Sequence, residues 1–163
     1  MEEEWPGKLQ YSITIPGNRI PFGSTIPIDF EFLPLIKGLL LKSISSKVIE
    51  SYNVNITSTI NVLPTSWEAS KVSNVSRTVC EETYVTDDGP NRPEDEEKSW
   101  KTTQYLCLPS CLDHCTQDTD SQRILVRHKL YTTIRFLNPD GHTSQVCQRT
   151  SSNYSMRKWS NES

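Results

Sequence analysis

Hydrophobic and polar residues alternate along several stretches of this chain, which is the period of a β-strand with one buried face. Residues 9–15, LQYSITI, place leucine, tyrosine and isoleucines on one face and polar side chains on the other. Residues 25–35, TIPIDFEFLPL, repeat the pattern. Pro27 has no amide proton to give to a strand ladder, so it favours an edge or a strand start. The proline, glycine and asparagine at positions 16–18 predict a turn between the two strands.

Two longer stretches show the same alternation. Even positions from 44 to 56 are mostly apolar and odd positions mostly polar, and residues 124–137, ILVRHKLYTTIRFL, give the clearest strand of all. Residues 78–84 and 101–106 are weaker strand candidates. Helical periodicity is hard to find, and the strands are joined by proline and glycine turns. The pattern therefore predicts an all-β fold, an antiparallel β-sandwich.

The residues after the clearest strand have the composition of a tight turn. They are Asn138, Pro139, Asp140 and Gly141. Proline presets φ at the first corner of a turn, aspartate can accept a bond from the backbone ahead of it, and glycine takes the left-handed position. We therefore predict a β-hairpin that turns at these four residues.

Two of the three histidines flank this turn, at positions 128 and 142. His128 falls on the apolar face of the strand, where a lone histidine is more often a hydrogen-bonded core residue than a general base. Because a strand rises about 3.3 Å per residue, we expect His128 and His142 to lie far apart. The sequence thus predicts a strand and a turn here and no catalytic pair.

Composition narrows the class of protein. The net charge is −3, and lysines and arginines are not interleaved with aromatic residues, so nucleic-acid binding is not expected. The longest apolar run, at 33–41, is broken by Lys37 and Gly38, so no membrane span is predicted. Without an export signal, the five cysteines are interpreted as reduced thiols of a cytosolic protein. The alternative, a secreted disulfide-bonded glycoprotein, has four N-x-S/T matches in its favour.

One domain is expected from the length of 163 residues. We place the sandwich at residues 9–144. Residues 86–98, TDDGPNRPEDEEK, have no apolar side chain and predict a flexible acidic loop, with an acidic docking segment as the alternative. Residues 145–163 are rich in serine and asparagine and show no strand period, so an irregular tail is expected.

The densest group of metal-binding side chains lies in CLPSCLDHC. The candidate zinc ligands are Cys107, Cys111, His114 and Cys115. Zinc sites usually combine two well-separated pairs of ligands, whereas here three thiols fall within nine residues. We therefore predict no metal site and no cofactor, and keep a small zinc-binding protein as an alternative.

Motifs for catalysis are also missing from the sequence. No G-x-S-x-G nucleophile elbow occurs, and no glycine-rich loop suited to phosphate is present. A cysteine nucleophile needs a nearby histidine base and a pocket that excludes water, and the sequence shows no loop that would complete such a site. We therefore name no catalytic residue and expect no enzyme.

Two long blocks of the sequence resemble the C-terminal arrestin domain of fungal arrestin-related trafficking adaptors. The first is WPGKLQYSITIPGNRIPFGSTIPIDFEFLPLIKGLLLKSISSKVIES, with its Y-S-I-T-I-P strand, IPIDF and L-P-L-I-K-G-L. The second runs from LCLP through C-T-Q-D-T to I-L-V-R-H-K-L and L-N-P-D-G-H. The resemblance covers residues 5–144 and implies an immunoglobulin-like β-sandwich.

The resemblance also implies a function. Adaptors of this family bind the cytosolic regions of plasma-membrane transporters or receptors and recruit a HECT-type ubiquitin ligase, so that the cargo is ubiquitylated and internalised. We therefore expect a cytoplasmic protein, peripheral at the plasma membrane or endosomes. Recruitment in the family uses PY motifs that dock in WW domains of the ligase, and none of the six tyrosines here has the preceding prolines. No protein-binding residue is predicted.

The chain departs from the family pattern in two further ways. No counterpart of the arrestin N-terminal domain is expected in these residues, and QVCQRTSSNYSMRKWSNES is expected to replace the family's next strand after Ser144. We therefore expect an incomplete sandwich, with an exposed sheet edge near Ile134 and Phe136. The alternative function is a truncated fragment, from splicing or an altered reading frame, that is inactive or competes with complete adaptors for cargo.

Overall fold

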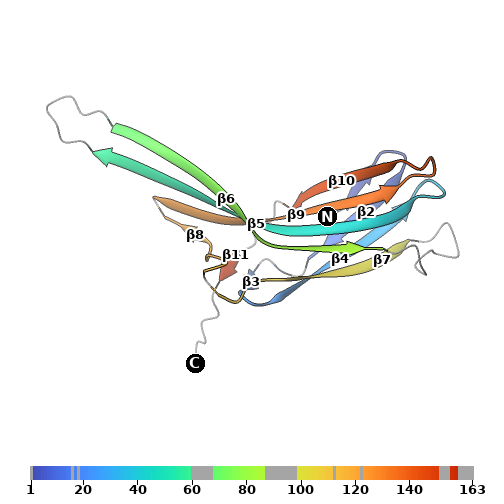
Figure 1. Cartoon of the computed structure of the whole chain (residues 1–163), viewed down its shortest axis with the longest axis horizontal. Helices are drawn as coiled ribbons and strands as arrows, with labels where there is room; N and C mark the ends of the chain where they lie inside the picture. The colour runs from blue at the N-terminus through green and yellow to red at the C-terminus, as the bar shows by residue number, and fades with distance from the viewer. Residues whose placement is uncertain are drawn as a thin grey trace.

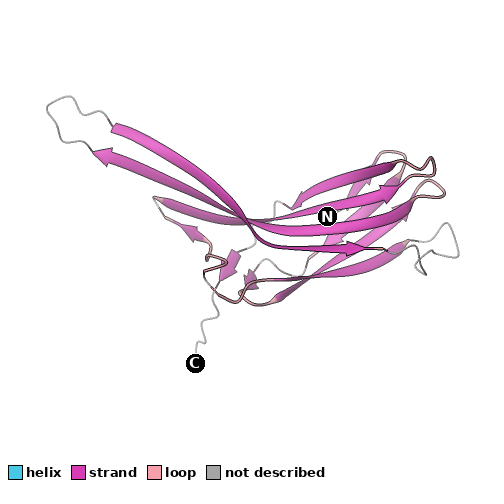
Figure 2. Cartoon of the chain, viewed as in Figure 1, coloured by secondary structure: helices cyan, strands magenta, loops and turns pink. Residues whose placement is uncertain are grey.

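The computed structural model describes residues 2–15, 17, 19–59, 68–86, 99–111, 113–121, 123–150 and 155–157. Within these ranges every regular element is a β-strand (Figure 2), which confirms the predicted all-β class. No helix long and apolar enough to cross a membrane occurs in this part of the chain. The strands are β1 (Glu2–Trp5), β2 (Leu9–Thr14), β3 (Arg19–Pro21), β4 (Thr25–Pro34), β5 (Leu40–Thr59), β6 (Glu68–Val85), β7 (Trp100–Cys107), β8 (Thr119–Asp120), β9 (Ile124–Leu137), β10 (Thr143–Thr150) and β11 (Ser155–Arg157).

Two antiparallel sheets form the body of the molecule (Figure 1). One has the strand order β1-β2-β4-β7, and the other has the order β10-β9-β5-β6, with the short β8 paired to β9. Strands β3 and β11 form a small parallel pair. Residues of both sheets belong to one hydrophobic core, which confirms the predicted antiparallel β-sandwich.

Alternation in the sequence becomes alternation of burial. Strands β2, β4 and β9 bury every second side chain against the opposite sheet. At one end of the core Phe32 of β4 meets Phe136 of β9 edge-on, with ring centroids 5.8 Å apart, and Trp5 and Trp100 pack beside them. Ile124, expected on the buried face of β9, is 44% exposed because it is the first residue of the strand, beyond the core.

Pro27 belongs to β4, which pairs with β2 along one side and with β7 along the other. Strand β2 pairs only with residues 29–34 of β4. The one strand beside Pro27 is therefore β7, where Tyr105 lies opposite it. The missing amide proton therefore does not interrupt a ladder in the middle of the sheet, as expected for a proline near a strand start.

The hairpin between β9 and β10 turns at Asn138 to Gly141. The backbone N–H of Asn138 donates to the carbonyl of His142 at 2.8 Å, and Gly141, at φ +83°, donates to the carbonyl of Asn138 at 2.9 Å. The Asn138 side chain also donates to the His142 carbonyl and to the hydroxyl of Ser144. His142 is exposed on this turn, while His128 is buried in the interior.

The prediction of an irregular tail from residue 145 is wrong for residues 145–150. These residues belong to β10, which pairs with β9 along its whole length, and residues 155–157 form β11. Ile134 and Phe136, expected at an uncovered edge, are fully buried. Strand β10 shows no hydrophobic alternation because it is the outer edge of its sheet, where backbone pairing sets the register and polar side chains occupy inward positions. Residues 87–98 of the predicted acidic loop lie outside the described residues.

Strands β5 and β6 continue past the sandwich as a two-stranded arm (Figure 1). Strand β9 pairs with β5 as far as Val54, whereas β5 and β6 remain paired to Thr59 and Glu68. We call the region where β9 stops pairing with β5 the base of the arm. It is the place where the main cluster of buried polar side chains forms.

Candidate functional site

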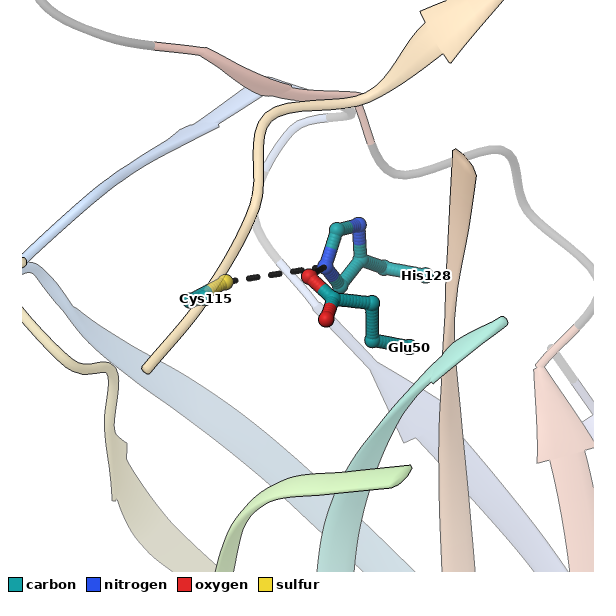
Figure 3. A group of neighbouring side chains, drawn as sticks. All are labelled: Glu50, Cys115 and His128. Atoms are coloured by element: carbon teal, nitrogen blue, oxygen red, sulfur yellow. Dashed lines mark hydrogen bonds and ion pairs between the residues drawn. The ribbon is translucent and has the colours of Figure 1, made fainter. Parts of the chain in front are cut away.

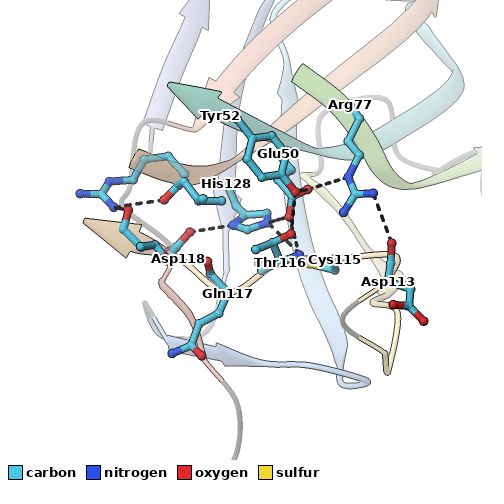
Figure 4. A network of polar contacts seen from close by, with 12 residues as sticks. Glu50, Tyr52, Arg77, Asp113, Cys115, Thr116, Gln117, Asp118 and His128 are labelled. Atoms are coloured by element: carbon cyan, nitrogen blue, oxygen red, sulfur yellow. Dashed lines mark hydrogen bonds and ion pairs between the residues drawn. The ribbon is translucent and has the colours of Figure 1, made fainter. Parts of the chain in front are cut away.

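A network of polar side chains, most of them buried or half-buried, occupies the base of the arm (Figure 4). Strand β5 contributes Glu50 and Tyr52, strand β6 contributes Arg77, and strand β9 contributes His128. The segment 113–118, which has no regular structure, lies across these strands and completes the network with Asp113, Cys115, Thr116 and Asp118.

Glu50 is the centre of the network. Its side chain is fully buried, and both carboxylate oxygens accept hydrogen bonds. Oε1 accepts from Nε of Arg77 at 2.6 Å and from the hydroxyl of Tyr52. Oε2 accepts from the backbone N–H of Thr116 at 2.5 Å and lies 3.0 Å from Nε2 of His128. A carboxylate without partners would not be stable in this position, because desolvation of a lone charge costs several kcal/mol.

These contacts determine the charge state of Glu50. Burial raises the pKa of the carboxyl, but hydrogen bonds from Tyr52, Thr116 and Arg77, together with nearby His128, outweigh burial and bring that pKa below its ordinary value. Burial, followed by the hydrogen bond to Glu50, raises the pKa of the Tyr52 hydroxyl. At neutral pH Glu50 is therefore an ionised acceptor and Tyr52 a neutral donor.

His128 is held at both ring nitrogens. Nδ1 lies 2.7 Å from Oδ1 of Asp118, while Nε2 lies 3.0 Å from Glu50 and 3.5 Å from Sγ of Cys115 (Figure 3). The ring is buried, as the alternation of β9 predicts. The sequence predicted a hydrogen-bonded core histidine, and the structure places polar partners at both ring nitrogens.

The network also fastens segment 113–118 to the sandwich. Arg77 donates to the carbonyl of Asp113 at 3.3 Å, and the hydroxyls of Tyr52 and Thr116 lie 2.5 Å apart. Together with the Thr116–Glu50 and Asp118–His128 contacts, these bonds tie the segment to three different strands. One chemical role of the network is therefore to hold this segment against the base of the arm.

Cys115, His128 and Asp118 lie in the order of a nucleophile, a base and the group that orients it. Cys115 is fully buried, and burial, with the nearby Glu50 charge next, raises the pKa of its thiol to about 12. A thiol with that pKa is protonated at neutral pH, and buried structural cysteines are inert. The arrangement therefore does not present an activated nucleophile.

A small apolar cavity lies beside His128. Its volume is about 10 Å³, enough for one water-sized group and too little for an organic substrate. The lining residues are Ile15, Ile20, Ile26, Val48, His128, Lys129 and Leu130.

The four zinc candidates from the sequence do not assemble. Cys107 and Cys111 are exposed, His114 is exposed as well, and only Cys115 is buried. In the part of the chain that the structure describes, the group of three or more potential ligands that comes together is Glu50, Cys115 and His128. Cys115 is thus the one member of the predicted cluster that meets other potential ligands, and these come from distant strands.

Sequence reasoning missed Glu50, Arg77 and Asp118. Glu50 carried a usable signal, because it occupies an even position between Val48 and Tyr52 on the inward face of β5. A charged residue at an inward position predicts a buried partner. Arg77 and Asp118 carried no comparable signal. Arg77 lies 27 residues from its partner Glu50, and Asp118 lies 10 residues from its partner His128.

Comparison with known families gives one broad match. The sequence model of the family described as "Arrestin (or S-antigen), C-terminal domain" matches residues 5–154. This range includes the sandwich strands from β2 to β10 and continues beyond residue 144, where the sequence interpretation expected the resemblance to end.

Relatives of known name share this region. The probable HECT-type ubiquitin ligase-interacting protein creD of Aspergillus clavatus is 36% identical over 147 residues, and the HECT-type ubiquitin ligase-interacting protein creD of Emericella nidulans is 34% identical over 149 residues. Each alignment covers 90% of this chain and 24% of the relative, so the chain spans about a quarter of their length. Among solved structures, the sporulation control protein Spo0M from Bacillus subtilis aligns at 12% identity with a TM-score of 0.45, covering 94% of this chain and 51% of that one. The resemblance inferred from the two sequence blocks is thus confirmed, and the chain belongs to the arrestin C-terminal domain family.

Proposed function

We propose that this chain is an adaptor domain that binds the cytosolic regions of plasma-membrane transporters or receptors for ubiquitin-dependent endocytosis and trafficking. The observation that carries the proposal is the arrestin C-terminal domain match over residues 5–154, joined to relatives named for interaction with a HECT-type ubiquitin ligase. We propose a non-enzymatic role, supported by the buried, protonated Cys115 and by a cavity too small for an organic substrate.

Within this proposal, cargo binding and ligase binding are separate activities. The chain matches about a quarter of the relatives' length, and none of its tyrosines follows the prolines of a PY motif. We therefore assign cargo binding to this domain and treat ligase binding as a property to be measured for the chain by itself. Peripheral association with the cytoplasmic face of the plasma membrane or endosomes follows from cargo binding.

A domain exchange tests the cargo assignment. The matching segment of creD is replaced by this chain in an Emericella nidulans strain that lacks its own creD, and ubiquitylated membrane proteins are quantified. We expect the chimaera to restore ubiquitylation of the membrane proteins that depend on creD. The control is the same chimaera carrying Ile134→Asp, which places a charge in the fully buried core and prevents folding of the sandwich.

The outcome that rejects the proposal is a chimaera that accumulates to normal levels and still binds the ligase, yet supports no more ubiquitylation of membrane proteins than its Ile134→Asp control. A second measurement incubates the purified chain with a purified HECT-type ligase. Binding there would extend the proposal to ligase recruitment by this domain, whereas binding only by the chimaera would assign recruitment to the rest of creD.

A further inference from the structure

We propose that Glu50, Cys115 and His128 bind one zinc ion at the base of the arm (Figure 3). The ligand atoms would be a carboxylate oxygen of Glu50, Sγ of Cys115 and Nε2 of His128. Together they form the sulfur, nitrogen and oxygen donor set that zinc accepts, with a fourth position for water. The proposal does not depend on the adaptor function, because it concerns only residues buried in this chain.

The distances between the ligand atoms suit a tetrahedral ion. Zinc bonds of about 2.3 Å to sulfur and about 2.0 Å to nitrogen and oxygen place neighbouring ligand atoms about 3.3–3.6 Å apart. Sγ of Cys115 lies 3.5 Å from Nε2 of His128, and Oε2 of Glu50 lies 3.0 Å from the same nitrogen. All three atoms lie within 4.8 Å of one another. The sulfur–nitrogen distance already matches a zinc site, and a movement on the order of 0.3 Å brings the oxygen–nitrogen pair to the spacing of two zinc ligands.

Groups around the three ligands orient them as a zinc site requires. Asp118 lies 2.7 Å from Nδ1 of His128, so a proton on Nδ1 leaves the lone pair of Nε2 directed at the ion. Arg77 and Tyr52 both donate to Oε1 of Glu50, and Oε2, which accepts from the backbone N–H of Thr116, is the oxygen 3.0 Å from Nε2 of His128. Carboxylate–histidine pairs and hydrogen-bonded carboxylates of this kind surround most protein zinc sites.

The charges at the site balance when zinc is present. Glu50 and Asp118 bring two negative charges and Arg77 brings one positive charge. A zinc ion bound to a Cys115 thiolate and a neutral His128 adds one net positive charge, which makes the cluster neutral.

Binding includes a proton transfer from the thiol. In the metal-free protein the pKa of the Cys115 thiol is raised to about 12, chiefly by burial and then by Glu50. A coordinated thiol is deprotonated outright, so the zinc–sulfur bond forms as the S–H proton leaves to solvent. The ion then joins β5, β9 and segment 113–118, and we expect it to stabilise the base of the arm by mass action.

Cobalt is a suitable probe because Co²⁺ replaces zinc and absorbs light when a thiolate binds it. The full chain is stripped with a chelator and titrated with Co²⁺, with Cys107, Cys111 and Cys147 replaced by serine to remove the exposed thiols. We expect a thiolate charge-transfer band and tetrahedral visible bands that saturate at one cobalt per chain. Zinc should abolish these bands, and elemental analysis should then find one zinc per chain.

Two variants make the test specific. Cys115→Ser should remove the charge-transfer band. Asp118→Asn keeps all three ligands and should weaken cobalt binding by about 10–100-fold, the usual effect of losing a carboxylate behind a histidine ligand. Far-ultraviolet circular dichroism must show folded protein in both variants. The proposal is overturned if the parent protein binds no cobalt at micromolar concentrations, or if Cys115→Ser folds and binds cobalt with the same bands. If Cys115→Ser does not fold, the parent titration and Asp118→Asn provide the test. Weaker cobalt binding by folded Asp118→Asn then supports the proposal, and unchanged cobalt binding overturns it.

Discussion

Replacement of Glu50 by glutamine is the most direct test of the network at the base of the arm. The change keeps the size of the side chain and removes its charge, while one oxygen becomes an NH₂ group that can only donate. Glu50 now accepts bonds at both oxygens, so either orientation of the amide places a donor against existing donors: Arg77 and Tyr52 on one side, or the Thr116 N–H on the other.

The cost follows from these contacts. A buried donor that loses its acceptor costs about 1–3 kcal/mol, and removal of one partner from a buried ion pair costs about 3–5 kcal/mol. The side chain of Arg77 is 40% exposed, so water can solvate it once Glu50 is neutral, and the lower end of these ranges applies. We expect Glu50→Gln to lower the free energy of unfolding by about 3 kcal/mol, or the melting temperature by roughly 6–12 °C.

The assay is urea unfolding followed by tryptophan fluorescence in the presence of a chelator, so that no metal contributes. Glu31→Gln is the matched control, because Glu31 forms an exposed ion pair with Lys101 at 3.0 Å in the same sandwich and should change stability by less than about 0.5 kcal/mol. If the two variants have equal stability, the reasoning about the buried carboxylate is refuted.

Three further predictions follow from single residues. The pKa of Glu50 is lower in the folded chain than its ordinary value of 4.5, so its stabilising effect is present above about pH 4.5 and is lost as pH falls through the lower folded value. Glu50→Gln should therefore make the free energy of unfolding depend less on pH in this range. Parallel plots of the free energy of unfolding against pH for both proteins would contradict this. Gly141 has φ +83° with open space around it, so Gly141→Ala should cost about 1–2 kcal/mol in urea unfolding, and a neutral effect would argue against the turn. Exposed Cys107 and Cys111 should react with a thiol reagent in the native protein, whereas Cys115 should react only on unfolding; rapid native labelling of Cys115 by mass spectrometry would show that segment 113–118 opens.

Local features of the fold could be predicted because their signals lie within a few residues of one another. The alternation in 9–15, 25–35 and 124–137 identifies strands, since side chains on a strand face opposite sides and only one side meets the core. The turn at residues 138–141 needs only the backbone preferences of its own residues. The two motif blocks were sufficient to indicate the family, which the match over residues 5–154 confirms.

Strand β10 and the buried network were not predictable in this way. Strand β10 depends on backbone pairing with β9, and its inward side chains include Ser144 and Gln148, so its sequence lacks a hydrophobic period. Glu50 meets His128, 78 residues further along the chain, only because β5 and β9 are neighbours in one sheet.

The sequence by itself therefore determined the strand pattern, the hairpin turn, the all-β class and the arrestin resemblance. Only the tertiary structure decided that Cys115 lies beside Glu50 and His128, and that it does not cluster with Cys107 and Cys111. The physical reason is range. Strand period and turn preference depend on neighbours in sequence. The partners of a buried charge depend instead on the order of strands in the sheet, which brings together residues that are far apart in sequence and whose contact no local pattern predicts.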